Sequence, residues 1–260
     1  MQTQLKARYG SWAVVTGASS GIGREMALRL AKAGLNLVLV ARSQAVLEQM
    51  AKDLRDRDGI QVRLVIRDLS MAVSVDALVM QTADLDVGLL VAAAGFGTSG
   101  AFIDSRLEQE MEMLEVNCRS LLGLTWHFSQ RFAQQRRGGI VLMSSIVGFQ
   151  GMPFAAHYAA TKAYVQTLAE ALYVELAPYG VDVIAAAPGP TNSNFSDRAG
   201  MKMGKALSAG EVAQGTLNAL GRKPTVLPGF LSKLLVYSLV PLPRWARVRI
   251  MGGVMKSMIK

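Results

Sequence analysis

The stretch WAVVTGASSGIG, residues 12–23, decides the fold of this chain. Its apolar first part predicts a buried strand at Trp12–Thr16, and the residues after the turn predict a helix at Ile22–Ala33, which ends at Gly34. Such a strand-to-helix turn presents helix N–H groups and the positive end of a helix dipole to a pyrophosphate. Glycine in the turn lets the backbone approach that ligand closely. The stretch therefore predicts a phosphate-binding turn, although tight turns also use glycine for steric reasons alone.

Short apolar runs alternate with helical stretches along the rest of the chain, which is typical of βαβ units around a parallel sheet. Further strands are predicted at Asn36–Ala41, Gln61–Ile66, Gly88–Ala93, Ile140–Met143, Val181–Ala187 and Thr225–Leu227. Helices are predicted at Gln44–Arg55 after the cap Ser43, from Ser70 onward, at Leu107–Gln135, at His157–Leu176, and from the Ser208–Glu211 capping box to Gly221. We expect an α/β fold, in which residues 1–228 form one Rossmann-like, doubly wound parallel β-sheet with helices on both faces. Residues 229–260 form a basic, apolar tail.

Composition narrows the possible functions. The chain has 260 residues, 51% of them hydrophobic, which suffices for one substantial core. Its one cysteine, Cys118, cannot form an internal disulfide, and with only His127 and His157 beside it we expect no metal site. The polar, basic N-terminal segment does not resemble a signal peptide, so a cytoplasmic location is expected.

The formal net charge of +9 is concentrated in the tail. Residues 221–260 hold eight Lys and Arg and no acidic residue, whereas residues 1–220 hold the other 20 basic residues and all 19 acidic ones. The body is thus almost neutral and offers no broad basic face to a nucleic acid. We expect no nucleic-acid partner.

Tyr158 and Lys162 are four residues apart in a predicted helix, so they share one face. The pKa of free tyrosine, about 10, is too high for efficient proton transfer at neutral pH. An ammonium within a few ångströms stabilises the phenolate and lowers that pKa by about one to three. The pair predicts an acid–base group, although Tyr-x-x-x-Lys also occurs as ordinary surface decoration.

With its T-G-x-x-x-G-x-G turn and its Y-x-x-x-K pair, the chain resembles the short-chain dehydrogenase/reductase family over about residues 12–227. The resemblance implies that Tyr158 is the general acid in reduction. It implies that Lys162 lowers the pKa of Tyr158 and binds the nicotinamide ribose.

Two further positions match the family's catalytic set. Ser145, thirteen residues before Tyr158, would donate a hydrogen bond to the carbonyl oxygen, with the adjacent Ser144 as the rival assignment. Asn117 matches the position that supports a proton relay. A buried asparagine that stabilises a helix kink is the alternative for Asn117.

The resemblance also implies a set of cofactor contacts. Arg42 closes the second strand, where a cation favours the 2′-phosphate of NADP; a solvated arginine at a strand end is the alternative. The expected NADP contacts are Gly17, Ser19, Ser20, Gly21, Ile22, Gly23, Arg42, Asp68, Leu69, Ala94, Gly95, Tyr158, Lys162, Pro188, Gly189 and Thr191, with Ser193 as an alternative to Thr191. The family commonly has Asn-Asn-Ala-Gly where this chain has Ala-Ala-Ala-Gly at 92–95, so we expect this turn to lack bracing side-chain hydrogen bonds.

Apolar side chains and a polar loop flank the catalytic positions. The side chains that could form an apolar pocket are Phe149, Met152, Phe154, Phe195, Met201 and Met203. Residues Asn192–Leu207, rich in Gly, Met, Ser and Lys, are typical of a mobile lid. These features favour a hydrophobic small-molecule substrate.

The tail has two interpretations. Leu227–Pro243 is apolar, but it is too short and interrupted for a transmembrane helix. After it, apolar residues recur at three- or four-residue steps among basic ones, at Trp245, Val248, Met251, Met255 and Met258. Such a helix could lie in an anionic lipid surface as a peripheral membrane contact, or pack across the substrate cleft or a subunit interface.

The sequence therefore predicts an NADP(H)-dependent oxidoreductase that transfers hydride between the nicotinamide and a carbonyl or alcohol group, and that forms a homodimer or homotetramer. The alternative is a non-enzymatic, membrane-associated NADP-binding protein that retained the fold. The altered Ala-Ala-Ala-Gly turn and the basic tail support this alternative, whereas the filled catalytic positions oppose it.

Overall fold

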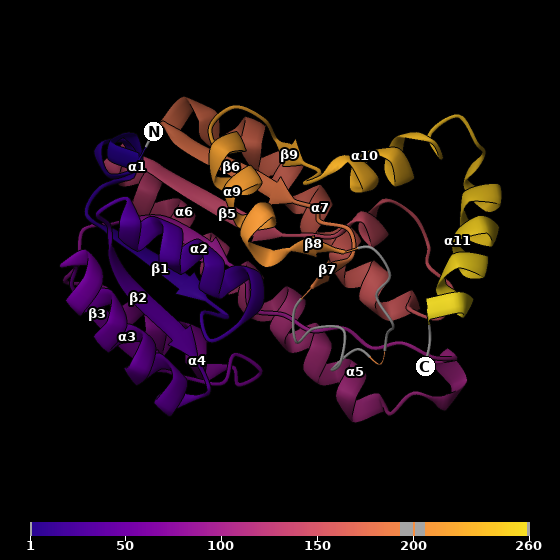
Figure 1. Ribbon diagram of the computed structural model, residues 1–260, viewed down its shortest axis with the longest axis horizontal. Coiled ribbons are helices and arrows are strands. Elements are labelled where there is room, and N and C mark those ends of the chain that lie inside the picture. Colours follow the sequence, from indigo (N-terminus) through magenta and orange to yellow (C-terminus); the bar gives the residue numbers. More distant parts are fainter. Residues whose placement is uncertain (1, 193–199, 201–205, 259–260) are drawn as a thin grey trace.

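The computed structural model describes residues 2–192, 200 and 206–258 and contains a seven-stranded sheet whose paired strands all run parallel (Figure 1). The strand order is β3-β2-β1-β4-β5-β6-β9. The strands are β1 (Trp12–Thr16), β2 (Asn36–Ala41), β3 (Val62–Ile66), β4 (Val87–Ala92), β5 (Gly138–Met143), β6 (Val181–Ala186) and β9 (Thr225–Val226). The predicted strands are confirmed, with ends that differ by at most two residues.

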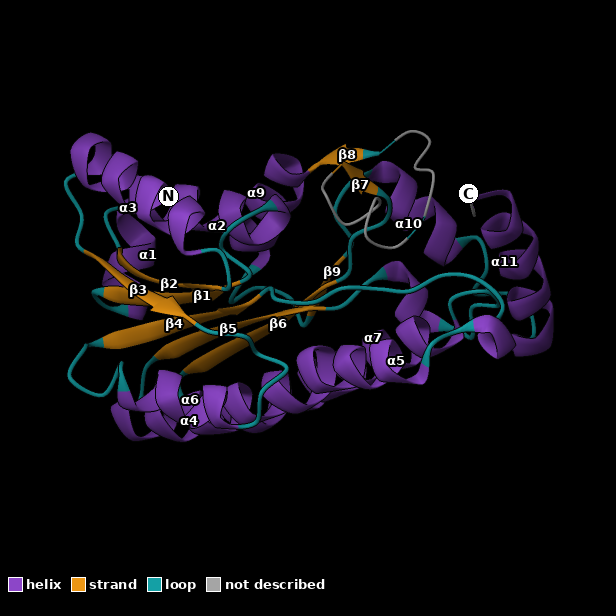
Figure 2. Cartoon of the chain, turned by 90° about the horizontal axis from the view of Figure 1, so that it is seen from below, coloured by secondary structure: helices purple, strands orange, loops and turns teal. Residues whose placement is uncertain are grey.

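Helices cover both faces of the sheet, as Figure 2 shows. One face carries α2 (Gly21–Lys32), α3 (Gln44–Asp58) and α9 (Ala209–Ala219), and the other carries α4 (Val73–Met80), α6 (Leu121–Gln135) and α7 (Ala156–Leu176). Leu30 and Leu47 belong to the apolar cluster on the first face, and Phe128 and Val165 belong to the cluster on the second. The sheet is therefore buried on both sides, and the predicted doubly wound α/β fold is confirmed.

The chain order of the strands reverses at β1, which lies between β2 and β4. Thr16, the last residue of β1, pairs with Val40 on one side and with Ala92 on the other. In doubly wound sheets, ligands bind in the crevice outside the carboxyl ends of the strands at such a reversal. The topology therefore points to the turn after Thr16 as the place to look for a ligand site.

One predicted helix start differs from the structure, and at another the expected cap bond is not made. Ser43 precedes α3 as expected, but its side chain makes no capping hydrogen bond. Ser70 does not begin a helix, because its backbone N–H and its hydroxyl both donate to the Asp68 carboxylate, each over 2.9 Å. The capping box of Ser208 and Glu211 is confirmed at the start of α9.

The predicted helix Leu107–Gln135 is interrupted. It consists of α5 (Leu107–Leu114), the π-helical segment η2 (Glu115–Ser120) and α6. The helix α1 (Gln2–Tyr9) was not predicted, because the sequence before β1 is polar and short. Tyr9 attaches it to the core, where the side chain is buried and its hydroxyl donates to Asp182 over 2.8 Å.

The structure also contains several short elements and two helices in the tail. They are η1 (Phe102–Asp104), η3 (Ile146–Phe149), η4 (Ala177–Tyr179), β7 (Thr191–Asn192), β8 (Leu207–Ser208), α10 (Phe230–Tyr237) and α11 (Arg244–Met258). Figure 1 shows α10 and α11 at the end of the molecule remote from β3.

Candidate active site

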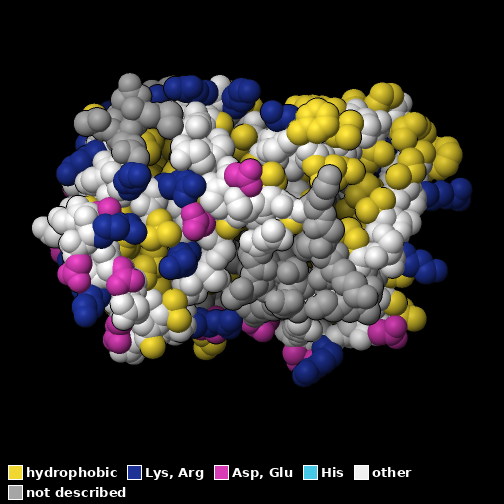
Figure 3. All heavy atoms as spheres, in the orientation of Figure 1, with side chains coloured by type: hydrophobic (Ala, Val, Ile, Leu, Met, Phe, Trp, Pro, Cys, Tyr) yellow, Lys and Arg dark blue, Asp and Glu magenta, His cyan; other side chains and the backbone are white. Residues whose placement is uncertain are grey.

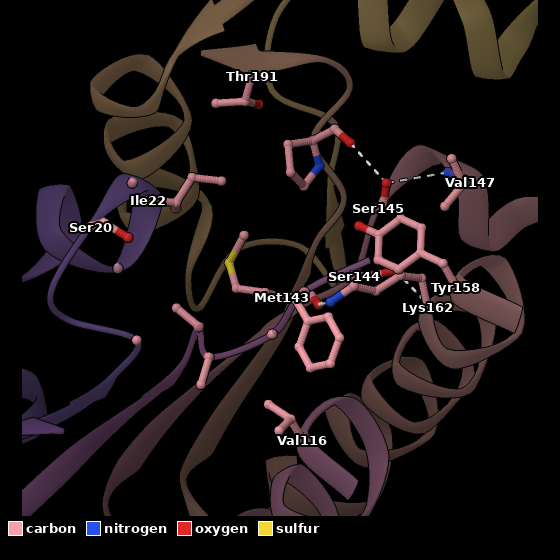
Figure 4. A pocket seen from close by; sticks show the side chains of 18 of the residues that line it. Ser20, Ile22, Val116, Met143, Ser144, Ser145, Val147, Tyr158, Lys162 and Thr191 are labelled. Atoms are coloured by element: carbon pink, nitrogen blue, oxygen red, sulfur yellow. Dashed lines mark hydrogen bonds between the residues drawn. The ribbon is translucent and has the colours of Figure 1, made fainter. Parts of the chain in front are cut away.

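A pocket of about 490 Å³ lies at the carboxyl ends of the central strands (Figure 4). Every residue predicted for catalysis or cofactor binding lines it, with the exceptions of Asn117 and of Ser193, which lies outside the described residues. The glycine-rich turn and the Tyr158–Lys162 pair, far apart in the sequence, thus face one cavity.

One wall of the pocket is formed by backbone at the turn between β1 and α2. Gly17 and Gly21 have φ of +67° and +54°, which residues with side chains rarely adopt. A Cβ on Gly23 would lie 2.5 Å from the Gly17 carbonyl oxygen, so only glycine permits this approach of strand and helix. Ser20 makes no side-chain capping bond to the first turn of α2. The uncapped helix start fits a phosphate-bearing cofactor.

The turn after β4 is braced, contrary to the expectation from its missing asparagines. The Thr16 hydroxyl accepts a hydrogen bond of 3.1 Å from the Ala94 N–H. The Asn117 side chain accepts from the Phe96 N–H over 3.1 Å and donates to the Phe96 carbonyl over 2.8 Å. Side chains from β1 and η2 therefore brace this turn, which has alanines at positions 92 and 93.

Asn117 is fully buried in the π-helical segment, and its remaining amide hydrogen bond goes to the Thr161 hydroxyl over 3.1 Å. The side chain is thus buried and structural, but its hydrogen bonds go to Phe96 and Thr161, and the role in a proton relay stays a prediction. A Cβ on Gly95 would lie 2.9 Å from the Asn117 Oδ1, so the pocket wall and this asparagine are in direct contact.

Tyr158 and Lys162 lie one turn apart on α7 and both line the pocket, as Figure 4 shows. The Lys162 Nζ lies 5.8 Å from the centroid of the Tyr158 ring. It donates a hydrogen bond of 2.8 Å to the carbonyl oxygen of Met143, the last residue of β5. The shared face of the two side chains is confirmed, and the lysine is anchored to the sheet.

Burial dominates the protonation of both groups. It raises the pKa of the Tyr158 phenol far above the usual value, and a hydrogen bond with Ser145 opposes this rise. It lowers the pKa of Lys162 to about 8. The expectation that the lysine makes the phenol more acidic stays a prediction, because burial is the largest influence on the pKa of the Tyr158 phenol here.

The neighbouring serines have different partners. The buried Ser144 hydroxyl donates to the Lys162 carbonyl over 3.0 Å and so ties α7 to β5. The Ser145 hydroxyl lies beside the phenol, accepts from the Val147 N–H and donates to the Pro188 carbonyl, each over 3.4 Å (Figure 4). Because bonds of this length are weak, the Ser145 hydroxyl can turn to a substrate oxygen, and the geometry favours Ser145 over Ser144.

Arg42 follows β2 and lines the pocket with Asp68 and Leu69. Its Nη1 lies 3.5 Å from the Asp68 carboxylate and 3.7 Å from the carboxylate of Glu112 on α5. The Arg42 side chain is half exposed, so these ion pairs are weak and a phosphate can compete with them. Glu112 was not predicted, because no motif marks a single charged residue within a helix.

The loop after β6 lines the pocket near Ser145. The Pro188 carbonyl accepts from the Ile146 N–H over 3.1 Å, and the Thr191 hydroxyl donates to the Gly189 carbonyl over 3.0 Å. The Gly189 N–H donates to the hydroxyl of Ser232, a buried residue of α10, over 3.0 Å. The first tail helix therefore holds this loop in place.

The remaining wall is apolar. Its members are Val116, Val147, Met152, Leu235, Met251, Val254, Met255 and Met258. Of the side chains predicted for it, Met152 is confirmed, whereas Phe149 and Phe154 pack in apolar clusters beside the pocket. Phe195, Met201 and Met203, with most of the predicted lid Asn192–Leu207, lie outside the described residues.

The sequence and the fold are both similar to known dehydrogenases. A family model described as short chain dehydrogenase matches residues 11–203. The chain is 32% identical to a 7β-hydroxysteroid dehydrogenase of Clostridium sardiniense over 88% of this chain and 89% of that one. A solved 7β-hydroxysteroid dehydrogenase has a TM-score of 0.88 at 28% identity, over 95% of this chain and 99% of that one. A short-chain dehydrogenase of Sphingobium yanoikuyae, solved in complex with NADPH, has a TM-score of 0.79 at 30% identity, over 95% and 94%.

Proposed function

Because the chain belongs to the short-chain dehydrogenase/reductase family, we propose that Tyr158, Ser145 and Lys162 are its catalytic residues. The protein is an NADP-dependent oxidoreductase that acts on CH–OH and C=O groups. When bound, NADPH supplies a hydride to the carbonyl carbon. The Ser145 hydroxyl donates a hydrogen bond to the carbonyl oxygen, and Tyr158 gives that oxygen its proton. The product is an alcohol, and the phenolate regains a proton from solvent.

The lining of the pocket supports an assignment of the cofactor contacts. The pyrophosphate would lie against the turn that contains Gly17, Ser19, Ser20, Gly21, Ile22 and Gly23, and Arg42 would bind the 2′-phosphate. Asp68 and Leu69 would contact the adenine. The nicotinamide ribose would lie against Ala94, Gly95 and Lys162, and the carboxamide against Pro188, Gly189 and Thr191. The glycine turn admits a backbone-bound phosphate, which is the fit expected of NADP. The Asn117 side chain would act by bracing Phe96, at the edge of this site.

We propose a bulky, apolar alcohol or ketone as the substrate. The support is the wall of methionine, valine and leucine side chains beside Tyr158, at the end of the pocket away from the glycine turn. Relatives named as 7β-hydroxysteroid dehydrogenases act on molecules of this class. Apolar side chains with a single polar centre orient such a substrate by shape and by its one reacting oxygen.

The observation that carries this proposal is the meeting of Tyr158 and Ser145 with the glycine turn in one pocket. The test is a panel of bulky and small ketones, among them a 7-oxosteroid, with NADPH as the reductant. Tyr158→Phe should lower kcat/KM by about 10²- to 10⁴-fold. The matched control is Tyr164→Phe, since Tyr164 lies on the same helix outside the pocket lining. NADPH affinity, measured by fluorescence, should change little in either variant.

The opposite outcome is also defined. If no ketone of the panel gives turnover that Tyr158→Phe loses, while NADPH still binds, the chain is a non-enzymatic NADP-binding protein.

We also propose that the chain forms a homo-oligomer and that its tail contacts a membrane. Exposed apolar side chains on α5 and α6, among them Met111, Leu122 and Trp126, support a homodimer or homotetramer. Light scattering after size exclusion tests this. The basic tail supports a peripheral contact with a membrane; within the described residues, no helix has the length and hydropathy to cross one.

A further inference from the structure

The tail helix α11 forms the roof over one part of the pocket. Met251 and Met255 are 5% and 3% exposed and belong to the same apolar cluster as Met152 and Tyr158. Met258 packs against this cluster, and all three tail methionines line the pocket. One face of α11 therefore borders the site where the substrate reacts.

Only apolar packing joins α11 to the body in the described part of the chain. The Arg247 guanidinium donates to the carbonyls of Val240 and Leu242, within the tail itself. No basic side chain of α11 forms an ion pair with a described carboxylate. Methionine side chains are flexible and repack readily, so such a contact permits the helix to shift.

The outer surface of α10 and α11 combines apolar and basic groups. Figure 3 shows hydrophobic side chains gathered over these two helices, with Lys and Arg beside them. The exposed apolar residues are Phe230, Leu231, Leu234 and Tyr237 on α10, Val240 between the two helices, and Trp245, Ile250 and Val254 on α11. Trp245 is 64% exposed, and the Arg249 guanidinium lies 5.5 Å from its ring centroid. We call this surface the tail patch.

Charge indicates what covers the tail patch. Lys233, Arg244, Arg249 and Lys256 are exposed on its two helices, and the chain has no acidic residue after Glu211. Aromatic and aliphatic side chains ringed by uncompensated basic ones match a bilayer with anionic headgroups. A second copy of this patch would place like charges against one another.

We propose that the tail patch binds an anionic lipid bilayer and that apolar substrate passes from the bilayer into the pocket beside α11. The proposal rests on the proposed function for its substrate, because only an apolar alcohol or ketone accumulates in lipid. The same helix borders the bilayer on one side and the catalytic pocket on the other, so the substrate reaches Tyr158 without crossing water.

The first experiment measures binding of the full chain to vesicles by sedimentation. Vesicles of phosphatidylcholine are compared with vesicles that contain phosphatidylglycerol. The double variant Arg244→Gln/Arg249→Gln should bind the anionic vesicles about 25-fold more weakly, at about fivefold per basic side chain. The control is Lys32→Gln/Lys52→Gln, which removes two exposed lysines from α2 and α3 and should bind like the wild type.

The second experiment measures the route of the substrate. Turnover of a ketone dissolved in anionic vesicles should fall about tenfold or more in Arg244→Gln/Arg249→Gln. Turnover of a water-soluble ketone should be unchanged, since neither arginine lines the pocket. Equal turnover of the vesicle-bound ketone by both proteins would overturn the proposed route.

Further outcomes separate the other possibilities. Equal sedimentation of the wild type and the arginine variant would overturn the lipid surface. If Trp245→Glu has a lower solution mass than the wild type, the tail patch binds a second copy of the chain, and the proposal is overturned. If the wild type binds the vesicles but turns over no ketone, the proposed function and the proposed route are both contradicted. The lipid surface would still be supported.

Discussion

The burial of Lys162 makes the stability of the cofactor-free protein depend on pH in a defined way. The side chain is 5% exposed, and burial lowers the pKa of Lys162 from 10.5 to about 8. The cost of burying the ammonium is fully present below pH 8 and is relieved as the pH rises toward 10.5, because there the unfolded chain binds more protons than the native one. From pH 7 to pH 10 this relief adds about 2 to 3 kcal/mol to the free energy of unfolding.

Lys162→Met removes this contribution. The variant also leaves the Met143 carbonyl without its hydrogen bond, which costs about 1 kcal/mol at every pH. The difference in unfolding free energy between wild type and Lys162→Met therefore changes with pH only through the ionisation of Lys162. Tyr158 does not interfere, because burial raises its pKa and its own effect begins only above about pH 10, where the unfolded tyrosine ionises.

The assay is urea unfolding at pH 7, 8, 9 and 10, followed by circular dichroism. The wild type should gain about 2 to 3 kcal/mol over Lys162→Met across this range. Lys52→Met, which removes an exposed lysine of α3, should show no such trend. A difference between wild type and Lys162→Met that stays constant to about 0.5 kcal/mol would mean that Lys162 titrates normally and would refute the reasoning.

Three substitutions test the cofactor end of the pocket. Arg42→Asp should weaken NADPH binding by about 10- to 100-fold and leave NADH binding nearly unchanged, since only the 2′-phosphate loses its cation; calorimetry that finds equal losses would contradict the NADP assignment. Glu112→Gln removes a carboxylate that competes with that phosphate for Arg42, so NADPH should bind several-fold more tightly while NADH does not. Gly23→Ala places a Cβ 2.5 Å from the Gly17 carbonyl and should abolish NADPH binding and lower Tm, whereas Gly253→Ala, where a Cβ meets open space, should keep both; NADPH binding retained by Gly23→Ala would contradict the close approach.

The predictable part of the molecule is the part that local rules determine. Continuous apolar runs identify strands buried on both faces, and parallel strands bring their carboxyl ends to one edge of the sheet. The residues after β1, β4, β5 and β6 could therefore be assigned to one pocket before any coordinates were known. The helical period predicted that Tyr158 and Lys162 share one face, and the family resemblance supplied their roles.

The unpredicted part depends on contacts between distant segments. Thr16 and Asn117 brace the turn after β4, but neither residue is near that turn in the sequence. Phe149 and Phe154 are apolar, as pocket residues are expected to be. In the structure they pack instead in the apolar clusters that include η3 and α11. The same limitation applies to the tail, whose amphipathic pattern fits a lipid surface and a pocket wall equally well, and whose methionines line the pocket.

The protonation states of Tyr158 and Lys162 in the cofactor-free site determine which groups are available for reduction of a carbonyl and for oxidation of an alcohol. Burial raises the pKa of Tyr158, so the phenol holds its proton at neutral pH, and that is the form needed to protonate a carbonyl oxygen. Oxidation of an alcohol needs the phenolate instead, and a buried phenolate is stable only when positive charge is added nearby. Lys162 can supply that charge at neutral pH, because a pKa of about 8 leaves most of the ammonium protonated there. The cofactor-free site therefore holds the phenol in the form that reduction uses, with a protonated lysine one helical turn away to stabilise the phenolate left by proton donation.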